Sequence, residues 1–139
     1  MSKVDTRAMM CIRVNSLAKG CSGIQASVIE QIISYLNEDI IPVIPRIGSL
    51  GASGDLAPLS HMALALIGEG EVWNDDGIAC PTNELLNKRG LIAVDLAAKD
   101  GLSLINGTSQ MCSFLLNSEQ RLSNLILFAD LIACASMEA

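Results

Sequence analysis

A glycine-rich segment at residues 48–61 constrains this chain more than any other part of its sequence. It reads Gly-Ser-Leu-Gly-Ala-Ser-Gly-Asp-Leu-Ala-Pro-Leu-Ser-His. Glycine tolerates backbone angles that other residues avoid, and small residues let a turn fold back tightly. The segment therefore predicts a compact loop. A helix should begin after it, near Asp55, because the proline three residues later is tolerated in a first helical turn.

Three residues at the centre of this loop, Ala52, Ser53 and Gly54, can form an electrophile from the chain itself. The amide nitrogen of Gly54 can attack the carbonyl carbon of Ala52, and loss of water then closes a five-membered ring. Loss of a second water, from the Ser53 side chain, leaves an exocyclic methylene. Glycine suits the attacking position because it has no Cβ to obstruct the approach. The product is a methylidene-imidazolone. By itself, however, an Ala-Ser-Gly sequence usually forms only a flexible turn.

Three segments together resemble the aromatic amino acid lyase family, which comprises histidine, phenylalanine and tyrosine ammonia-lyases and related aminomutases. They are residues 48–61, residues 13–23 (Arg-Val-Asn-Ser-Leu-Ala-Lys-Gly-Cys-Ser-Gly) and residues 104–108 (Leu-Ile-Asn-Gly-Thr). Their order and separation also fit the family, so the resemblance runs from about Thr6 to the C-terminus. It implies a mainly α fold, as one segment of a large helical-bundle lyase. It also implies an enzyme that eliminates ammonia from an amino acid.

The resemblance also implies which residues form the site. Ala52, Ser53 and Gly54 would supply the methylidene-imidazolone autocatalytically, with no external cofactor. Asn106 would hold that group or the substrate amine, because its amide can donate and accept hydrogen bonds at once. The alternative is that Asn106 only shapes a turn before a helix.

Two neighbours of the triad have supporting roles. Asp55 is expected at a helix N-cap, and the resemblance adds help with the cyclisation. The N-terminus of that helix would direct N–H groups towards the loop, where they would stabilise negative charge that develops there. Leu56 either lines the substrate pocket or packs in the core. Arg13 and Lys19 belong to a family motif, but for both we expect structural pairing.

Histidine is the expected substrate, because residues 17–20 and 56–61 look most like the histidine enzymes. Ser109, which follows the Asn-Gly-Thr motif, looks more like tyrosine or phenylalanine lyases and aminomutases, and these stay open as an alternative. A second alternative is a catalytically dead fragment that packs against partner helices. His61 lacks the partners of a hydrolytic triad, and the glycine spacing lacks the signature of a phosphate-binding loop.

The composition excludes several other classes of protein. The 139 residues carry a net charge of −6, which argues against a nucleic-acid partner, and no basic run suggests an anionic membrane. No uncharged apolar run reaches the ~18 residues that span a bilayer, and residues 1–5 lack the apolar core of a signal peptide. The five cysteines lack Cys-x-x-Cys spacing, which argues against a zinc site or a disulfide framework. We therefore expect a cytoplasmic protein without a metal.

The length fits the family less well. Family members are several times longer, and their catalytic tyrosine lies upstream of the region that this chain matches. The chain has one tyrosine, Tyr35, and a helical pattern surrounds it. We therefore expect residues 1–139 to be a single incomplete domain, the electrophile-bearing part of an ammonia-lyase that is a homotetramer when full length.

Hydrophobic periodicity predicts the elements that surround these motifs. A helix is expected over residues 6–19, and a second one should open with a capping box formed by Ser22 and Gln25. Two prolines predict an extended segment over residues 40–45. Alternation and a turn sequence predict one small β-hairpin over residues 72–79.

Helical segments are also expected in the second half of the chain. Thr82 should cap a short helix that ends at Gly90, and residues 93–99 should form a further helical turn. From Thr108 onward, a long helix is apolar on more than one side. Such a helix requires neighbours around most of its circumference.

Overall fold

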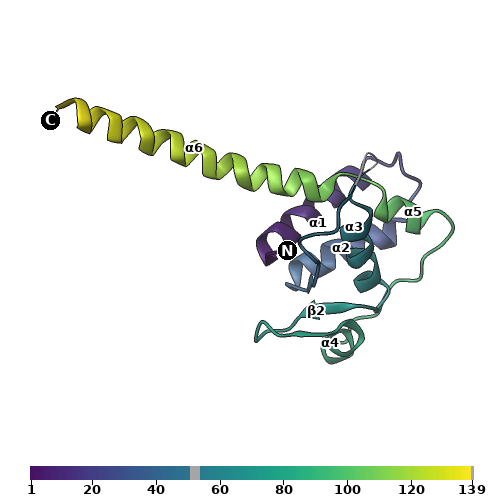
Figure 1. Ribbon diagram of the computed structural model, residues 1–139. Helices are drawn as coiled ribbons and strands as arrows, with labels where there is room; N and C mark the ends of the chain where they lie inside the picture. Colours follow the sequence, from purple (N-terminus) through teal and green to yellow (C-terminus); the bar gives the residue numbers. More distant parts are fainter. Residues whose placement is uncertain (51–53, 139) are drawn as a thin grey trace.

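The computed structural model describes residues 1–50 and 54–138. In this part of the chain, six helices and three short strands follow one another: α1 (Lys3–Leu17), α2 (Ala26–Asn37), β1 (Ile41–Pro42), α3 (Leu56–Leu66), β2 (Glu71–Trp73), β3 (Ala79–Pro81), α4 (Thr82–Arg89), α5 (Asp100–Ile105) and α6 (Ser109–Glu138). Figure 1 shows a rounded head made of the first eight elements, from which α6 projects as a long rod. The prediction of a mainly α fold is confirmed.

The core of the head lies between α1, α2 and α3. Each helix contributes a buried stripe at helical spacing. Burying one large apolar side chain of this kind stabilises the fold by roughly 1.5–3 kcal/mol. The fully buried members of the core include Met9, Met10, Ile32, Tyr35, Leu59, Met62 and Leu66. Helix α1 also packs against the base of α6, and α3 packs against α5. The elements that carry the three family motifs therefore surround one core.

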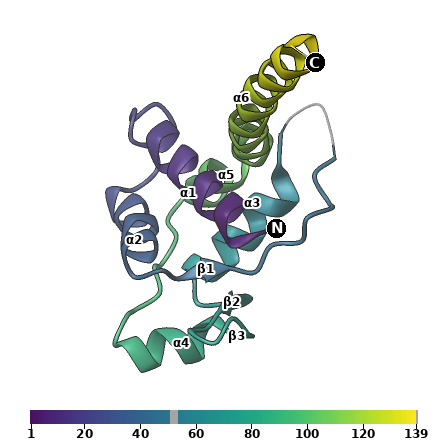
Figure 2. The ribbon, with the colours of Figure 1, turned by 90° about the vertical axis from the view of Figure 1, so that its left-hand side faces the viewer.

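The predicted hairpin is confirmed, but the sheet has a third strand. Strands β2 and β3 pair antiparallel, with Val72 opposite Cys80, and β1 adds to the other edge of β2, with Pro42 opposite Val72. Strand β1 lies within the segment over residues 40–45 that was predicted to be extended. Two residues are too few for an alternating pattern, so its pairing with β2 could not be recognised from the sequence. Figure 2 shows the sheet and α4 on the side of the head opposite to α6.

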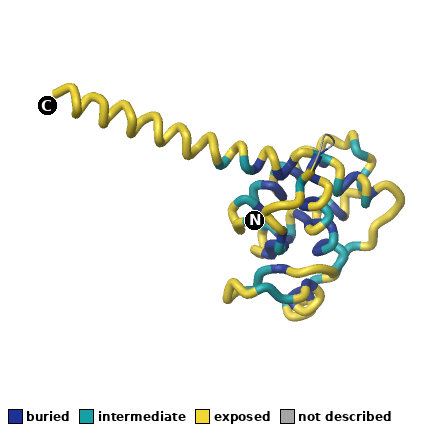
Figure 3. The backbone as a smooth tube through the Cα atoms, in the orientation of Figure 1, coloured by how far each residue is buried: buried dark blue, intermediate teal, exposed yellow. Residues whose placement is uncertain are grey.

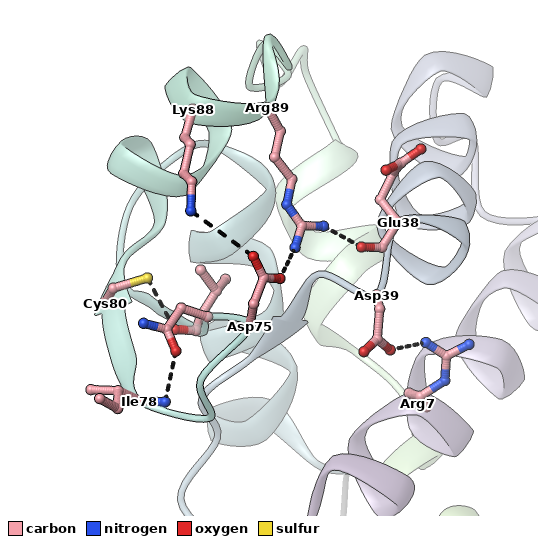
Figure 4. Close-up of polar contacts among 10 residues, drawn as sticks. Arg7, Glu38, Asp39, Asp75, Ile78, Cys80, Lys88 and Arg89 are labelled. Atoms are coloured by element: carbon pink, nitrogen blue, oxygen red, sulfur yellow. Dashed lines mark hydrogen bonds and ion pairs between the residues drawn. The ribbon is translucent and has the colours of Figure 1, made fainter.

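Polar contacts on the surface connect this sheet to α2. The Asp75 carboxylate, in the hairpin turn, accepts a hydrogen bond of 2.7 Å from Arg89 of α4, whose guanidinium also donates to the carbonyl oxygen of Glu38 at the end of α2 (Figure 4). Nearby, Arg7 and Asp39 form an ion pair of 2.6 Å. Exposed ion pairs each contribute less than about 1 kcal/mol. These contacts therefore orient the sheet more than they stabilise it.

The predicted capping box at Ser22 is wrong. Helix α2 begins later, at Ala26, and its N-cap residue, Gln25, makes no side-chain cap bond. The carboxylate of Asp100 takes this role from the start of α5: it accepts hydrogen bonds from the Gln25 backbone N–H (2.9 Å), the Gln25 side-chain amide (2.6 Å) and the backbone N–H of Ala97 (2.8 Å). The bond from the Gln25 side chain is the main reason why the pKa of Asp100 lies below its usual value.

Two predictions about the segment after the hairpin also need correction. Residues 93–99 form no helix, and the helical turn lies further on, in α5. Thr82 is the first residue of α4 rather than its cap, and its hydroxyl, which is buried, has no hydrogen-bond partner among the described residues. The predicted end of α4 is confirmed, since Gly90 is the C-cap with a φ of +67°.

The long C-terminal helix is confirmed as α6, but only its base packs against described residues, chiefly those of α1. Only Ser109, Gln110 and Ser113 of α6 are buried, and residues 118–138, which we call the outer part of α6, are exposed throughout (Figure 3). Its large apolar side chains, each more than half exposed, are Leu122, Leu125, Ile126, Leu127, Phe128, Leu131, Ile132 and Met137. Even so, no described helix has the length and apolar content that crossing a membrane requires.

Candidate active site

The loop that precedes α3 brings Gly54 against the Asn-Gly-Thr motif. Of the proposed triad, Ala52 and Ser53 lie outside the described residues. Gly54 is buried and has a φ of +127°, a value that side-chain-bearing residues rarely adopt. A Cβ on Gly54 would overlap the carbonyl oxygen of Gly107 and lie 3.0 Å from its carbonyl carbon. Both the backbone angle and the available space therefore require glycine here.

Asp55 fixes this contact through its backbone and its side chain. Its N–H donates to the carbonyl oxygen of Gly107 over 2.7 Å. Its carboxylate is fully buried and accepts hydrogen bonds from the Ser49 hydroxyl (2.7 Å) and from the backbone N–H of Met111 (2.9 Å). Three parts of the chain, the loop before α3, the Asn-Gly-Thr turn and the start of α6, are therefore connected through one residue.

The N-cap prediction for Asp55 is correct in position but not in partner. Asp55 precedes the first residue of α3, yet its side chain makes no cap bond to that helix. It binds instead the N–H of Met111, in the first turn of α6. A carboxylate is favourable at this place because the first N–H groups of a helix lack partners within the helix and carry partial positive charge. The aspartate therefore stabilises the start of a helix 56 residues away along the chain.

On the opposite side of the Asn-Gly-Thr turn lies the guanidinium of Arg13. This side chain is only 4% exposed, and its Nη2 atom donates to the carbonyl oxygens of Asn106 (2.9 Å) and Ser103. Burial lowers the pKa of Arg13 from its usual value. The pairing that the sequence predicted for Arg13 therefore involves backbone carbonyl oxygens, whereas Lys19 is exposed.

Asn106 is held by its backbone and presents its side chain at the surface. It is the C-cap of α5, where its N–H donates to the carbonyl oxygen of Leu102 over 3.1 Å and its own carbonyl oxygen accepts from Arg13. Asn106 as a whole is exposed to solvent. We call Arg13, Gly54, Asp55, Asn106 and Gly107 the Gly107 junction. Each of the three family motifs contributes to it.

Other candidates from the sequence lie outside this junction. Leu56, the first residue of α3, is 42% exposed, so it does not pack in the core of the described residues. His61 is exposed and borders a small hollow of about 140 Å³ beside the loop. Tyr35 lies in the core, where its hydroxyl donates to the carbonyl oxygen of Ala65 (2.7 Å) and burial raises its pKa to about 12. Such a phenol is a poor base near neutral pH.

Metal coordination has no support among the residues that the structure describes. In residues 1–50 and 54–138, no three histidine, cysteine or acidic side chains are placed to hold an ion.

Sequence reasoning did not recognise Arg13 and Gly107 as members of the site, although a signal was present. Arg13 falls on the buried stripe of α1, in register with Met9, Met10 and Leu17. A charged residue on an apolar stripe contradicts the pattern around it, and such conflicts concentrate at functional sites. The contact to Gly107 has no signal of this kind, because nothing local links residues 94 positions apart.

Comparison with known proteins identifies the class of protein to which this chain belongs. The family described as aromatic amino acid lyase matches residues 1–139. The tyrosine ammonia-lyase of Cupriavidus metallidurans is 48% identical over 137 residues, which cover 99% of this chain and 26% of that protein. The histidine ammonia-lyase of Chloroflexus aurantiacus is 49% identical over 135 residues, which cover 96% of this chain and 25% of that protein.

A solved structure agrees with these sequence matches. The tyrosine aminomutase of Streptomyces globisporus superimposes with a TM-score of 0.71 at 47% identity, over 78% of this chain and 20% of that one. The chain belongs to the aromatic amino acid lyase family, whose ammonia-lyases break carbon–nitrogen bonds. It spans about a quarter of the length of the curated relatives it matches.

Proposed function

We propose that this chain is the electrophile-bearing part of an ammonia-lyase that converts L-histidine to urocanate. The observation that carries the proposal is the contact of Gly54 with Gly107, reinforced by the 2.7 Å hydrogen bond between the Asp55 N–H and the Gly107 carbonyl. This contact fixes the last residue of the Ala-Ser-Gly triad against the Asn-Gly-Thr motif. Membership of the lyase family supports the same reading.

The residues around Gly54 fit a methylidene-imidazolone made from Ala52, Ser53 and Gly54. Gly54 lacks the Cβ that would collide with Gly107, and its φ is one that favours a tight turn. When formed, the group supplies an electron-poor alkene, a kind of electrophile that no ordinary side chain provides. Asp55 would hold the chain in the geometry from which the ring closes. No external cofactor is needed in this proposal.

Asn106 is proposed to orient the substrate amine or the group itself. Its backbone is fixed from two sides, by Leu102 and by Arg13, so its exposed amide starts from a defined position. If this role is correct, Asn106→Ala should lower kcat by roughly 10²–10³-fold with little change in melting temperature. If Asn106 only shapes the turn, the same change should cost about 1 kcal/mol of stability and leave turnover nearly intact.

The second candidate function uses the same chemistry on another substrate. Ser109 follows the Asn-Gly-Thr motif, and relatives of nearly equal identity include a tyrosine ammonia-lyase and a tyrosine aminomutase. A phenylalanine or tyrosine ammonia-lyase or an aminomutase is therefore the alternative. A catalytically dead segment that packs against partner helices is a further one, and the exposed apolar length of α6 favours it. We also propose a homotetramer in the cytoplasm.

One set of measurements tests the proposal. The protein is expressed from the complete reading frame that contains this sequence, and we call it the complete-frame protein. Its intact mass should be lower than the sequence mass by two water molecules, and Ser53→Ala should remove both the second dehydration and most of the activity. Turnover of L-histidine, L-tyrosine and L-phenylalanine then identifies the substrate. An intact mass that lacks the loss of two water molecules, together with no turnover of any of the three amino acids, would refute the lyase proposal.

A further inference from the structure

Arg13 is a buried charge that enters the proposed function only through its contact with the Asn106 backbone. It lies on the inward face of α1, between Met10 and Leu17, where an apolar side chain would pack. None of the ion pairs among the described residues includes it, and its Nε atom has no hydrogen-bond partner there. Burying a charge without a counter-ion is costly, and a well-packed hydrophobic residue is often as stable or more so. Fold stability alone therefore gives a weak reason for an arginine here.

The contacts of Arg13 point to a different reason. Its Nη2 atom donates to the carbonyl oxygens of Ser103 and Asn106, which belong to the last turn and the cap of α5. Carbonyl oxygens at the end of a helix lack partners within the helix and carry partial negative charge, which suits a cation. The planar guanidinium can serve two such oxygens in fixed directions, whereas a lysine ammonium acts as a point charge.

The guanidinium also faces the glycine of the Asn-Gly-Thr motif. A Cβ added to Gly107 would overlap the Nη1 atom of Arg13 and lie 3.1 Å from its Cζ atom. On its carbonyl side, the same glycine meets Gly54 and accepts the hydrogen bond of Asp55. The Gly107 residue is thus enclosed between Arg13 and the end of the Ala-Ser-Gly triad. A shift of the arginine would be transmitted to both sides of the turn.

We propose that Arg13 is a positioning residue, which sets the Asn106–Gly107 backbone at a fixed distance from Gly54. The proposal rests on the proposed function, because it gives Arg13 a role only through the site that Asn106 and Gly54 form. Arg13 touches neither substrate nor the reacting atoms in this account. It acts by fixing where the Asn106 amide starts and where the Gly107 carbonyl receives the Asp55 N–H.

The first test measures the backbone contact directly. Arg13→Met and Arg13→Lys are made in the complete-frame protein, and hydrogen–deuterium exchange is followed at the Asp55 amide. We expect roughly tenfold or faster exchange at Asp55 in both variants, with the amides of α2 unchanged, because only the contact to Gly107 is loosened. Met10→Ala is the control for a general loss of stability, and it should speed exchange across the head without singling out Asp55.

The second test measures the consequence for the chemistry. Turnover per cyclised molecule, counted by intact mass, should fall about 10²-fold in Arg13→Ala, since small misplacements at a reacting site have effects of this size. Methylguanidinium should restore part of it, and methylammonium at the same concentration should not. Arg7→Met, an exposed arginine on the same helix, should leave turnover unchanged.

The outcomes separate this proposal from the one on which it rests. Unchanged exchange at Asp55 in the Arg13 variants would overturn the positioning role, whether or not the protein is active. Equal rescue by both cations would also overturn it, because a guanidinium-specific geometry would then be unnecessary. A wild-type protein without the mass loss and without turnover would refute the lyase function instead. If Arg13→Ala does not fold, Arg13→Lys supplies both measurements.

Discussion

Around Gly107 the chain leaves no room for one methyl group, whereas the outer part of α6 leaves whole apolar side chains in solvent. In the Gly107 junction, Cβ atoms at Gly54 and at Gly107 would overlap a carbonyl and a guanidinium. In residues 118–138 every side chain is exposed, from Leu122 to Met137. Adding a single side-chain atom changes the stability of a closely packed region, whereas it has little effect on an unpacked helix surface. We therefore expect substitutions in the Gly107 junction to change the free energy of unfolding more than substitutions in the outer part of α6.

The largest effect is expected from Gly54→Ala. The new Cβ would overlap the Gly107 carbonyl, and a φ of +127° adds backbone strain, so we expect a loss of about 3 kcal/mol or more in the free energy of unfolding. Urea denaturation measures it. Gly101→Ala in α5 is the matched control: nothing lies within 4 Å of its Cβ position, and removing a helical glycine should stabilise by roughly 0.5–1 kcal/mol. Equal effects at the two sites would contradict the tight packing of the junction.

The next effect in size concerns Asp55→Ala. It would leave the Ser49 hydroxyl and the Met111 N–H without their acceptor, and we expect a loss of about 2 kcal/mol. Thermal unfolding and exchange at the Met111 amide both report it. Because the partner N–H belongs to α6, the change should loosen the first turn of α6 as well as the loop. If only the amides of α3 exchanged faster, Asp55 would act as an ordinary N-cap of α3.

A smaller effect should follow from pH through Asp100. Hydrogen bonds, above all from the Gln25 side chain, lower the pKa of this carboxyl in the folded protein. The contribution of Asp100 to folding stability is therefore fully present above its pKa in the unfolded chain, which is about 4 for an aspartate. It is lost as the pH falls through the lower pKa of the folded protein. Urea midpoints measured from pH 6 downward should fall, and in Asp100→Asn they should fall less steeply. An identical slope in both proteins would exclude Asp100 as a source of acid sensitivity.

The smallest effect on stability is expected in the outer part of α6. Leu125 is 64% exposed, so Leu125→Glu should change the free energy of unfolding by less than about 0.5 kcal/mol. The same substitution should reduce association of the 139-residue chain, because a continuous exposed apolar surface drives aggregation. Sedimentation at several concentrations compares the two proteins. A strongly destabilised monomer would show that Leu125 is packed against something in the head.

Sequence patterns predicted local elements well where one helix or one turn carried its own signal. The start of α3 after Asp55, the end of α4 at Gly90 and the extent of α6 follow from spacing, proline and glycine, which act within a few residues. The capping box at Ser22 was wrong for the converse reason. Its role belongs to Asp100, 75 residues beyond Gln25, and no local pattern reports a partner at that distance.

For the candidate site, too, some features could be predicted from the sequence and others only from the tertiary structure. The sequence by itself determined the family, because residue types and their order carry this information. It is also the source of the prediction that Ala52, Ser53 and Gly54 form an electrophile and that Asn106 belongs to the site. Only the tertiary structure decided that Arg13 and Asp55 meet the Asn-Gly-Thr turn from opposite sides, with hydrogen bonds that reach as far as 93 residues along the chain. The physical reason is that chemistry resides in side-chain types, whereas position results from packing, which brings together α1, α3, α5 and α6 around one glycine.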